Sequence, residues 1–224
     1  MKRIGISQRV IIDQFGRKDA LEQAYLTYYS QFNILLFPIP NVLTDLELYL
    51  DELHLDGFIL SGGNDINPRM YNETSKKEEY ADERDATERK IVDYALKNKL
   101  PLLGQCRGMQ FLNVYFGGKL LENLSPFSKI SHVKNNHEIE IVDEKFKTLF
   151  GVDTTNVNSF HNQGLSEKEL AKELKIFALS ADGIVEGFYH PTFLIFGIMW
   201  HPEREWCDAE INKKIINYFF RISL

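Results

Sequence analysis

Continuous apolar runs alternate along this chain with segments whose apolar residues recur every three or four positions. The apolar runs lie at residues 3–7, 34–38, 57–61, 100–104 and 193–200. Runs of this kind suit strands that are buried on both faces. Helical spacing is found at residues 19–31, 44–53, 87–98 and 109–116. The strand–helix–strand alternation predicts an α/β fold with a mostly parallel central sheet and helices on both faces.

The second half of the chain predicts a smaller antiparallel section. Shorter strand-like segments lie at residues 139–142, 155–158, 175–179 and 184–189. Residues 208–222 carry isoleucine and phenylalanine at helical spacing and predict a closing helix. No internal repeat or linker-like segment interrupts the sequence, so a single domain over residues 1–224 is expected.

One long polar stretch, residues 72–90, is dense in lysine, glutamate, aspartate and arginine. We interpret it as a solvated loop that runs into the exposed face of a helix. Asp85, with Glu88 three residues later, predicts a capping-box start for that helix. The alternative is that residues 71–80 form a flap beside a pocket, since long loops in compact domains are often functional.

Composition excludes several classes of protein. A net charge of −6 without a basic stripe argues against nucleic-acid binding. No apolar run approaches the roughly 20 residues that span a bilayer, and Gln8 and Arg9 interrupt the N-terminal apolar residues, which makes a poor signal peptide. With only Cys106 and Cys207, the chain fits a reducing, cytoplasmic setting. The acidic neighbours of Cys207 should raise its pKa and leave it inert.

Cys106 occupies the point where a strand-like run gives way to helical spacing. The segment Gly104-Gln105-Cys106-Arg107-Gly108 is the cysteine counterpart of the G-x-S-x-G nucleophile elbow. Its glycines allow a sharp turn, and the following helix start places backbone N–H groups beside the sulfur, which favours the thiolate. Such a short match also arises by chance around a buried structural cysteine.

A second chemical signal follows the apolar run at residues 193–200. His201-Pro202-Glu203 places a histidine just beyond a buried strand, with a carboxylate two residues further on. Alone, it could be a polar strand exit with a surface ion pair. Together with Cys106, it supplies the nucleophile, base and orienting carboxylate of a thiol hydrolase.

The sequence resembles the class I glutamine amidotransferase-like proteins, which have a flavodoxin-like fold, and within them the γ-glutamyl hydrolases of peptidase family C26. The likeness runs in order through seven blocks, at residues 61–68, 83–88, 104–108, 113–118, 157–163, 181–183 and 200–203. It implies a small-molecule γ-glutamyl substrate and hydrolysis through a γ-glutamyl thioester. Family members act on γ-glutamyl conjugates of polyamine-derived acids, on folate polyglutamates and on γ-glutamyl-CDP-amidate, so the leaving group stays open.

The same resemblance assigns roles to individual residues. It makes Cys106, His201 and Glu203 catalytic, and the backbone amides of Gly63 and Arg107 the oxyanion hole, although two adjacent glycines are by themselves only a tight turn. Substrate contacts fall to Gln110, Ser159, Phe160 and His161. A glutaminase subunit that delivers ammonia to a separate synthase is the main alternative, and a non-catalytic binding protein is a third.

Other ligands are not indicated by the sequence. His54, His132, His137 and His190 show no zinc-like spacing with a cysteine or carboxylate, so each is interpreted as a surface or core histidine. A phosphate-binding glycine-rich loop is also missing. We therefore expect no metal and no nucleotide cofactor, and we leave a homodimer open.

Overall fold

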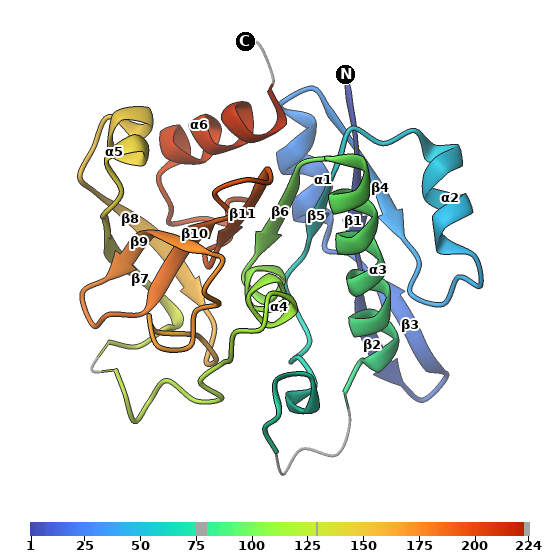
Figure 1. Ribbon diagram of the computed structural model, residues 1–224, viewed down its shortest axis with the longest axis horizontal. Coiled ribbons are helices and arrows are strands. Elements are labelled where there is room, and N and C mark those ends of the chain that lie inside the picture. The colour runs from blue at the N-terminus through green and yellow to red at the C-terminus, as the bar shows by residue number, and fades with distance from the viewer. Residues whose placement is uncertain (75–79, 129, 222–224) are drawn as a thin grey trace.

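The computed structural model describes residues 1–74, 80–128 and 130–221, and its strands form one large sheet and a separate hairpin (Figure 1). The strands are β1 (Lys2–Ser7), β2 (Arg9–Asp13), β3 (Gly16–Ala20), β4 (Ile34–Ile39), β5 (Gly57–Leu60), β6 (Leu102–Gln105), β7 (Val133–Ile141), β8 (Thr154–Phe160), β9 (Lys175–Ser180), β10 (Val185–Tyr189) and β11 (Ile195–Ile198). The large sheet has the order β4-β1-β5-β6-β11-β10-β9-β7-β8. Pairing is parallel from β4 to β11 and antiparallel from β11 to β8, which confirms the predicted mixed architecture.

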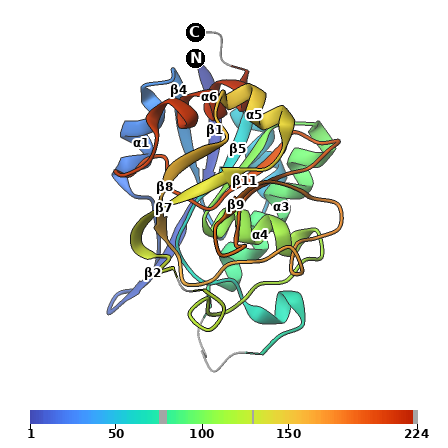
Figure 2. The same cartoon turned by 90° about the vertical axis from the view of Figure 1, so that its left-hand side faces the viewer.

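Helices cover both faces of this sheet (Figures 1 and 2). They are α1 (Gln23–Ser30), α2 (Leu46–Leu53), the 3₁₀ turn η1 (Pro68–Tyr71), α3 (Asp82–Asn98), α4 (Arg107–Tyr115), α5 (Glu144–Phe150) and α6 (Ala209–Phe220). The apolar faces of α2, α3 and α4 pack into one core cluster, while those of α1, α5 and α6 pack into a second cluster. Two separate cores, one on each face, are what a sheet of this kind requires.

Three neighbouring parallel strands place the site. Every residue of β5, β6 and β11 is buried, which explains their continuous apolar sequences. Leu60 pairs with Gly104, and Gln105 pairs with Ile198, so the three strands end at one edge. Ligands bind in α/β sheets outside the carboxyl ends of the strands. The residues that follow β5, β6 and β11 therefore meet there.

The structure differs from the sequence prediction mainly at exposed elements. The apolar run at residues 3–7 forms β1, but the chain then leaves the sheet after Ser7 and forms the β2–β3 hairpin, which the sequence did not predict. Ile11 and Ile12 of that hairpin are exposed, so no buried pattern marks it. The helix expected at residues 19–31 is shortened to α1, because residues 19–20 belong to β3. Of the alternative flap at residues 71–80, positions 75–79 lie outside the described residues.

Candidate active site

Cys106 sits on a strained turn between β6 and α4. Its φ of 52° and ψ of −108° place a residue with a side chain in a region that is normally left to glycine. The two flanking glycines are required by contact. A Cβ on Gly104 would meet the backbone carbon of Gly108 at 2.6 Å, and one on Gly108 would meet the carbonyl oxygen of Leu60 at 2.1 Å. The structure therefore contains the predicted elbow, and the first turn of α4 packs closely against the end of β5.

The imidazole of His201 lies between the side chains of Cys106 and Glu203. Nδ1 of His201 is 2.7 Å from Oε1 of Glu203, and both side chains are buried. Burial lowers the pKa of His201, but charge and hydrogen bonding from Cys106 and Glu203 outweigh it and raise the pKa to about 9. The imidazole is therefore protonated at neutral pH and faces the sulfur on one side and a carboxylate on the other.

Asn158 fixes the backbone of the histidine, a role that the sequence did not reveal. Its side-chain oxygen accepts from the amide of His201 at 2.9 Å, and its NH₂ group donates to the carbonyls of His201 and Glu205, both at 2.8 Å. The buried amide side chain thus uses its donors and its acceptor on the short segment that carries the imidazole. The sequence signal that could have indicated this role was the position of Asn158 in the block at residues 157–163.

The glycine turn after β5 lies against the same imidazole. A Cβ on Gly62 would meet Cε1 of His201 at 2.7 Å, and the amide of Gly62 donates to the Tyr25 hydroxyl at 3.0 Å. Gly63 has a φ of 105°, which favours glycine, and it borders the cavity together with Arg107. The amide of Arg107 belongs to the first turn of α4, where N–H groups have no partner within the helix.

A buried network of four charged side chains lies directly beneath the elbow. Arg107 pairs with Asp85 and Glu88, and Arg84 pairs with Glu88 at 2.9 Å. Arg84 also donates to the carbonyls of Ser61 and Gly62, at 2.7 and 3.0 Å. Burial lowers the pKa of Arg84 to about 10 and that of Arg107 to about 9, where repulsion from Arg84 adds to the effect. The network therefore joins α3 and α4 to the glycine turn.

This network corrects the interpretation of the polar stretch. The predicted capping box is wrong, because α3 begins at Asp82 with Ala81 as its N-cap and has no side-chain cap. Asp85 and Glu88 point inward to the two arginines and are buried. The helix face expected to be solvated is partly a buried ionic face. A residue pattern alone does not say which way the charges of a polar helix point.

Cys106 and His201 border a cavity of about 600 Å³. Its walls come from the β2–β3 hairpin, the turns that follow β5 and β11, α4 and the segments around β7 and β8. They comprise Arg9, Gly63, Asn64, Asp65, Cys106, Arg107, Gln110, Glu122, Val133, Lys134, Phe160, His161, Asn162, Gln163, His201 and Arg204. The sequence did not single out Arg9, Glu122, Lys134 or Arg204, because each is a common surface residue type outside any motif.

The expected substrate contacts divide into two groups. Gln110, Phe160 and His161 border the cavity, and the NH₂ group of Gln110 donates to the carbonyl of Gln163 at 2.9 Å. Ser159 is buried, and its hydroxyl donates to the carbonyl of His132 at 2.8 Å, away from the cavity lining. Neighbouring residues of the block at residues 157–163 therefore point to opposite sides of β8, because side chains alternate along a strand.

Cys207 is a poor nucleophile for a reason other than the expected one. Burial is the main cause that raises the pKa of its thiol to about 11, and the charges of Glu203 and Asp208 add to it. The NH₂ group of Asn212 donates to the sulfur at 3.0 Å. The direction of the predicted shift agrees with the structure, but acidic neighbours are the lesser cause.

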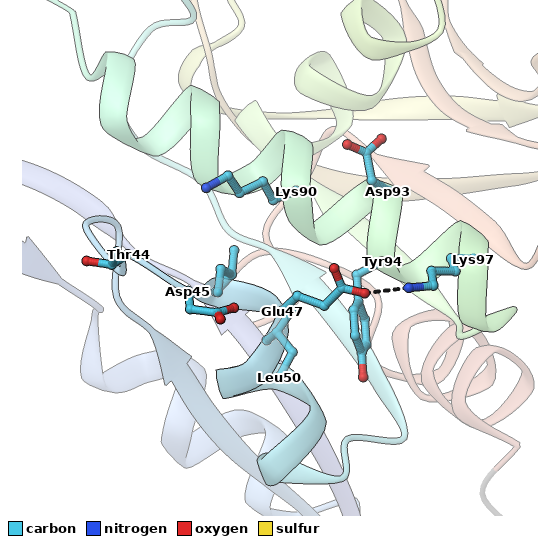
Figure 3. A pocket seen from close by; sticks show the side chains of 9 residues that line it. Thr44, Asp45, Glu47, Leu50, Lys90, Asp93, Tyr94 and Lys97 are labelled. Atoms are coloured by element: carbon cyan, nitrogen blue, oxygen red, sulfur yellow. Dashed lines mark hydrogen bonds and ion pairs between the residues drawn. The ribbon is translucent and has the colours of Figure 1, made fainter.

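A second hollow, of about 360 Å³, lies between α2 and α3 (Figure 3). Lys97 pairs with Glu47 across it, and the Tyr94 hydroxyl donates to Asp51 at 2.7 Å. Among the described residues, its walls hold neither a cysteine nor a histidine. The groups suited to nucleophilic chemistry therefore gather at Cys106.

The elbow, the histidine–carboxylate pair and the mixed sheet together define a hydrolase on a glutamine amidotransferase-like fold. Residues 4–203 match the family model of peptidase C26, and the chain belongs to that family. It is 35% identical to γ-glutamyl-CDP-amidate hydrolase of Campylobacter jejuni, with 98% of both chains covered. It is 29% identical to γ-glutamyl-γ-aminobutyrate hydrolase of Escherichia coli O157:H7, over 85% of this chain and 80% of that one.

A solved glutamine amidotransferase from Thermotoga maritima has the same fold. The TM-score is 0.63 at 18% identity, with 97% of this chain and 82% of that chain covered. At this identity the likeness concerns the fold alone. Among the described residues, none of the helices combines the length and the apolar character needed to cross a membrane.

The first prediction concerns the buried network. We expect Glu88→Gln to lower the free energy of unfolding by about 3–5 kcal/mol, because two buried guanidinium groups would keep only Asp85 as an anionic partner. Urea unfolding measures the change. Glu83→Gln is the matched control on the same helix: Glu83 pairs with Arg17 at the surface, and its loss should cost less than about 1 kcal/mol. Equal losses in the two variants would contradict this account of the network.

The second prediction concerns the pKa of His201. The folded value of about 9 exceeds the usual 6.5, so the interaction stabilises the protein fully below pH 6.5 and is lost as the pH rises through 9. Glu203→Gln removes the carboxylate charge and should lower the His201 pKa by roughly one to three units. NMR titration of the ring nitrogens measures it. Glu205→Gln, an exposed neighbouring carboxylate, should leave it unchanged. An unshifted titration in Glu203→Gln would disprove the coupling.

Proposed function

We propose that this protein hydrolyses a γ-glutamyl amide bond through a γ-glutamyl thioester on Cys106. The observation that carries the proposal is the strained elbow, which presents Cys106 to the same cavity as His201 and Gly63. The family membership and the γ-glutamyl hydrolases among the relatives support it. The imidazole of His201 lies beside the sulfur, where it takes and returns the proton of the reaction.

The reaction has two halves. The Cys106 thiolate attacks the γ-carbonyl carbon, and the C–N bond breaks as His201 gives its proton to the leaving nitrogen. A water molecule then attacks the thioester, while neutral His201 takes the proton from that water. The C–S bond breaks, glutamate leaves and the thiolate is restored. Glu203 holds the imidazole by Nδ1 throughout, so that Nε2 carries the transferred proton.

Both tetrahedral intermediates carry a negative oxygen. We assign its donors to the backbone amides of Gly63 and Arg107, because both residues border the cavity at the elbow. The positive φ of Gly63 and the helix start at Arg107 free these amides from regular secondary structure. Loss of one such donor typically costs about 2.7–4 kcal/mol of transition-state stabilisation.

The cavity has charges that suit a γ-glutamyl compound with an anionic leaving group. Glu122 offers a carboxylate to the α-ammonium group, and Gln110 and the segment that holds His161 offer polar groups to the α-amino acid end. Arg9 and Lys134 also line the cavity, and their positive charges suit phosphate oxygens. Together with the relative that covers 98% of this chain, they favour a γ-glutamyl-CDP-amidate type of substrate over an uncharged amine.

The alternative is a glutaminase subunit of an amidotransferase. Such a subunit hydrolyses glutamine itself and passes ammonia to a synthase, so it needs no pocket for a large leaving group. The cations of the cavity wall favour the hydrolase.

The third prediction tests the nucleophile. Cys106→Ala should reduce kcat for glutamate release by about 10⁴-fold or more, because no other group can form the thioester. Cys207→Ala is the matched control: its thiol is held mostly unreactive by burial, and activity should stay within about twofold of the wild type. Circular dichroism confirms that both variants fold. Glutamate release by Cys106→Ala at the wild-type rate would refute the mechanism.

The fourth prediction tests the substrate class. We expect kcat/KM for γ-glutamyl-CDP-amidate to exceed that for glutamine by at least about 100-fold, since ammonia fills none of the leaving-group region. The α-glutamyl isomer should be rejected as strongly, because it leaves buried polar groups unpaired. Lys134→Gln should lower kcat/KM for the charged substrate and leave that for γ-glutamyl-γ-aminobutyrate nearly unchanged. Efficient use of glutamine that increases with a synthase partner would favour the alternative instead.

A further inference from the structure

Four buried ionisable side chains converge next to the active-site cavity, outside the catalytic triad. They form a histidine–glutamate cluster of His132, His137, His161 and Glu186. Nδ1 of His132 and Nε2 of His137 each lie 3.5 Å from Oε1 of Glu186, and Nε2 of His161 lies 3.6 Å from the same oxygen. Glu186 is fully buried, and none of the histidines is more than 8% exposed. Three imidazoles therefore face one carboxylate oxygen in the interior.

These separations are long for hydrogen bonds and suit a shared metal ion. A nitrogen–oxygen hydrogen bond measures about 2.7–3.2 Å. Two ligand atoms bound about 2.0–2.2 Å from one zinc ion at the tetrahedral angle lie roughly 3.4 Å apart. Among the described residues, neither carboxylate oxygen of Glu186 has a hydrogen-bond partner, and Nε2 of His137 and of His161 has none either. Glu186, His137 and His161 thus turn buried polar atoms towards one another without contacts that satisfy them.

The opposite ring nitrogen of each histidine is already engaged. Nδ1 of His137 donates to the carbonyl of Glu138 at 3.2 Å, and Nδ1 of His161 donates to the carbonyl of Gln163 at 3.0 Å. A carbonyl only accepts, so each Nδ1 carries a proton, and Nε2 is the ring nitrogen that faces Glu186. This is the arrangement found around histidines that bind metals.

In His132 too, the ring nitrogen that faces away from Glu186 is engaged, here by a carboxylate. Its Nε2 lies 3.0 Å from Oδ2 of Asp182, which also accepts from the hydroxyls of Ser128 and Ser180. Asp182 therefore engages Nε2 of His132. Nδ1 of His132 faces Glu186 and also lies 3.4 Å from the Ser159 hydroxyl. The carboxylate–histidine pair is a common outer partner of zinc sites.

We propose that the histidine–glutamate cluster binds a zinc ion. Ligand atoms of His132, His137 and Glu186 all lie within 4.8 Å of one another, and imidazole nitrogen and carboxylate oxygen are ligand types that zinc takes. Nε2 of His161, 3.6 Å from the same Glu186 oxygen, moves closer to complete the four ligands of a structural site. Within the part of the chain that the structure describes, both oxygens of Glu186 and the Nε2 atoms of His137 and His161 are buried without a hydrogen-bond partner. A bound ion would satisfy these polar atoms.

The position of the site gives the ion a clear structural role. Its ligands come from the residue before β7, from β7, from the residue after β8 and from β10. Val133 and Lys134, next to His132, line the active-site cavity, as do His161 and its neighbours up to Gln163. The ion would therefore tie three strands of the antiparallel section to the cavity wall. The expectation that His132 and His137 are simple core or surface histidines changes accordingly.

The test uses full-length protein without a polyhistidine tag, since a tag would itself bind metal. The apoprotein is prepared with a chelator, given equimolar zinc chloride and dialysed against metal-free buffer. We expect about one zinc per chain by mass spectrometry of the elements, and a melting temperature that rises with added zinc. Wild-type protein that retains no zinc, with an unchanged melting temperature, would overturn the proposal.

Variants identify the ligands. Glu186→Gln keeps the shape of the side chain, and His137→Gln changes the most exposed histidine; both should weaken zinc binding at least 100-fold. His190→Gln is the matched control: it is another buried histidine, 3.6 Å from Glu173, outside the cluster. It should retain about one zinc per chain. Retention at the wild-type level by both cluster variants would overturn the assignment.

Cobalt(II) separates this site from the catalytic cysteine. Cobalt bound by three nitrogens and one oxygen should give the visible absorption of a four-coordinate ion without a near-ultraviolet sulfur-to-cobalt band. Cys106→Ala should give the same spectrum and the same stoichiometry. A thiolate band that disappears in Cys106→Ala would place the metal at the triad and refute the proposed site.

Discussion

The carboxylate of Glu88 is the contact on which the geometry of the active site depends. It accepts from Ser7 on β1 at 2.7 Å and pairs with Arg84 on its own helix and Arg107 on α4. Arg84 extends the network to the glycine turn after β5. Hydrophobic residues of similar volume would often stabilise a fold as well as such a network does. Apolar contacts are non-directional, however, whereas these charges fix the helix start relative to the turn.

The sequence predicted the parallel half of the sheet well, because strands buried on both faces must be apolar throughout, as β5, β6 and β11 are. It predicted the exposed elements poorly. The β2–β3 hairpin has few buried residues, and the antiparallel β7 begins at Val133, six residues before the expected strand, because its first half is polar and largely exposed. Elements that bury little surface leave a weak pattern.

At the site, motifs of adjacent residues were predictable and long-range contacts were not. The elbow around Cys106 and the His201–Glu203 pair are local in sequence, so their spacing reveals them. Asn158 lies 43 residues from the histidine that it holds, and Glu186 lies 49 residues after His137 in the sequence. Only the pairing of β8, β7, β9 and β10 brings the members of the histidine–glutamate cluster together.

At Cys106, the backbone conformation that the proposed reaction needs lowers the stability of the fold. Holding a side chain at a φ of 52° costs about 1–3 kcal/mol, and glycine at this position would avoid most of that cost. A chain that has lost its nucleophile to glycine would thus fold at least as well as the active one. Selection for folding alone would remove the cysteine, and only the proposed reaction would retain it. A descendant protein that replaced the cysteine by glycine and took a binding role would lose no stability of the fold.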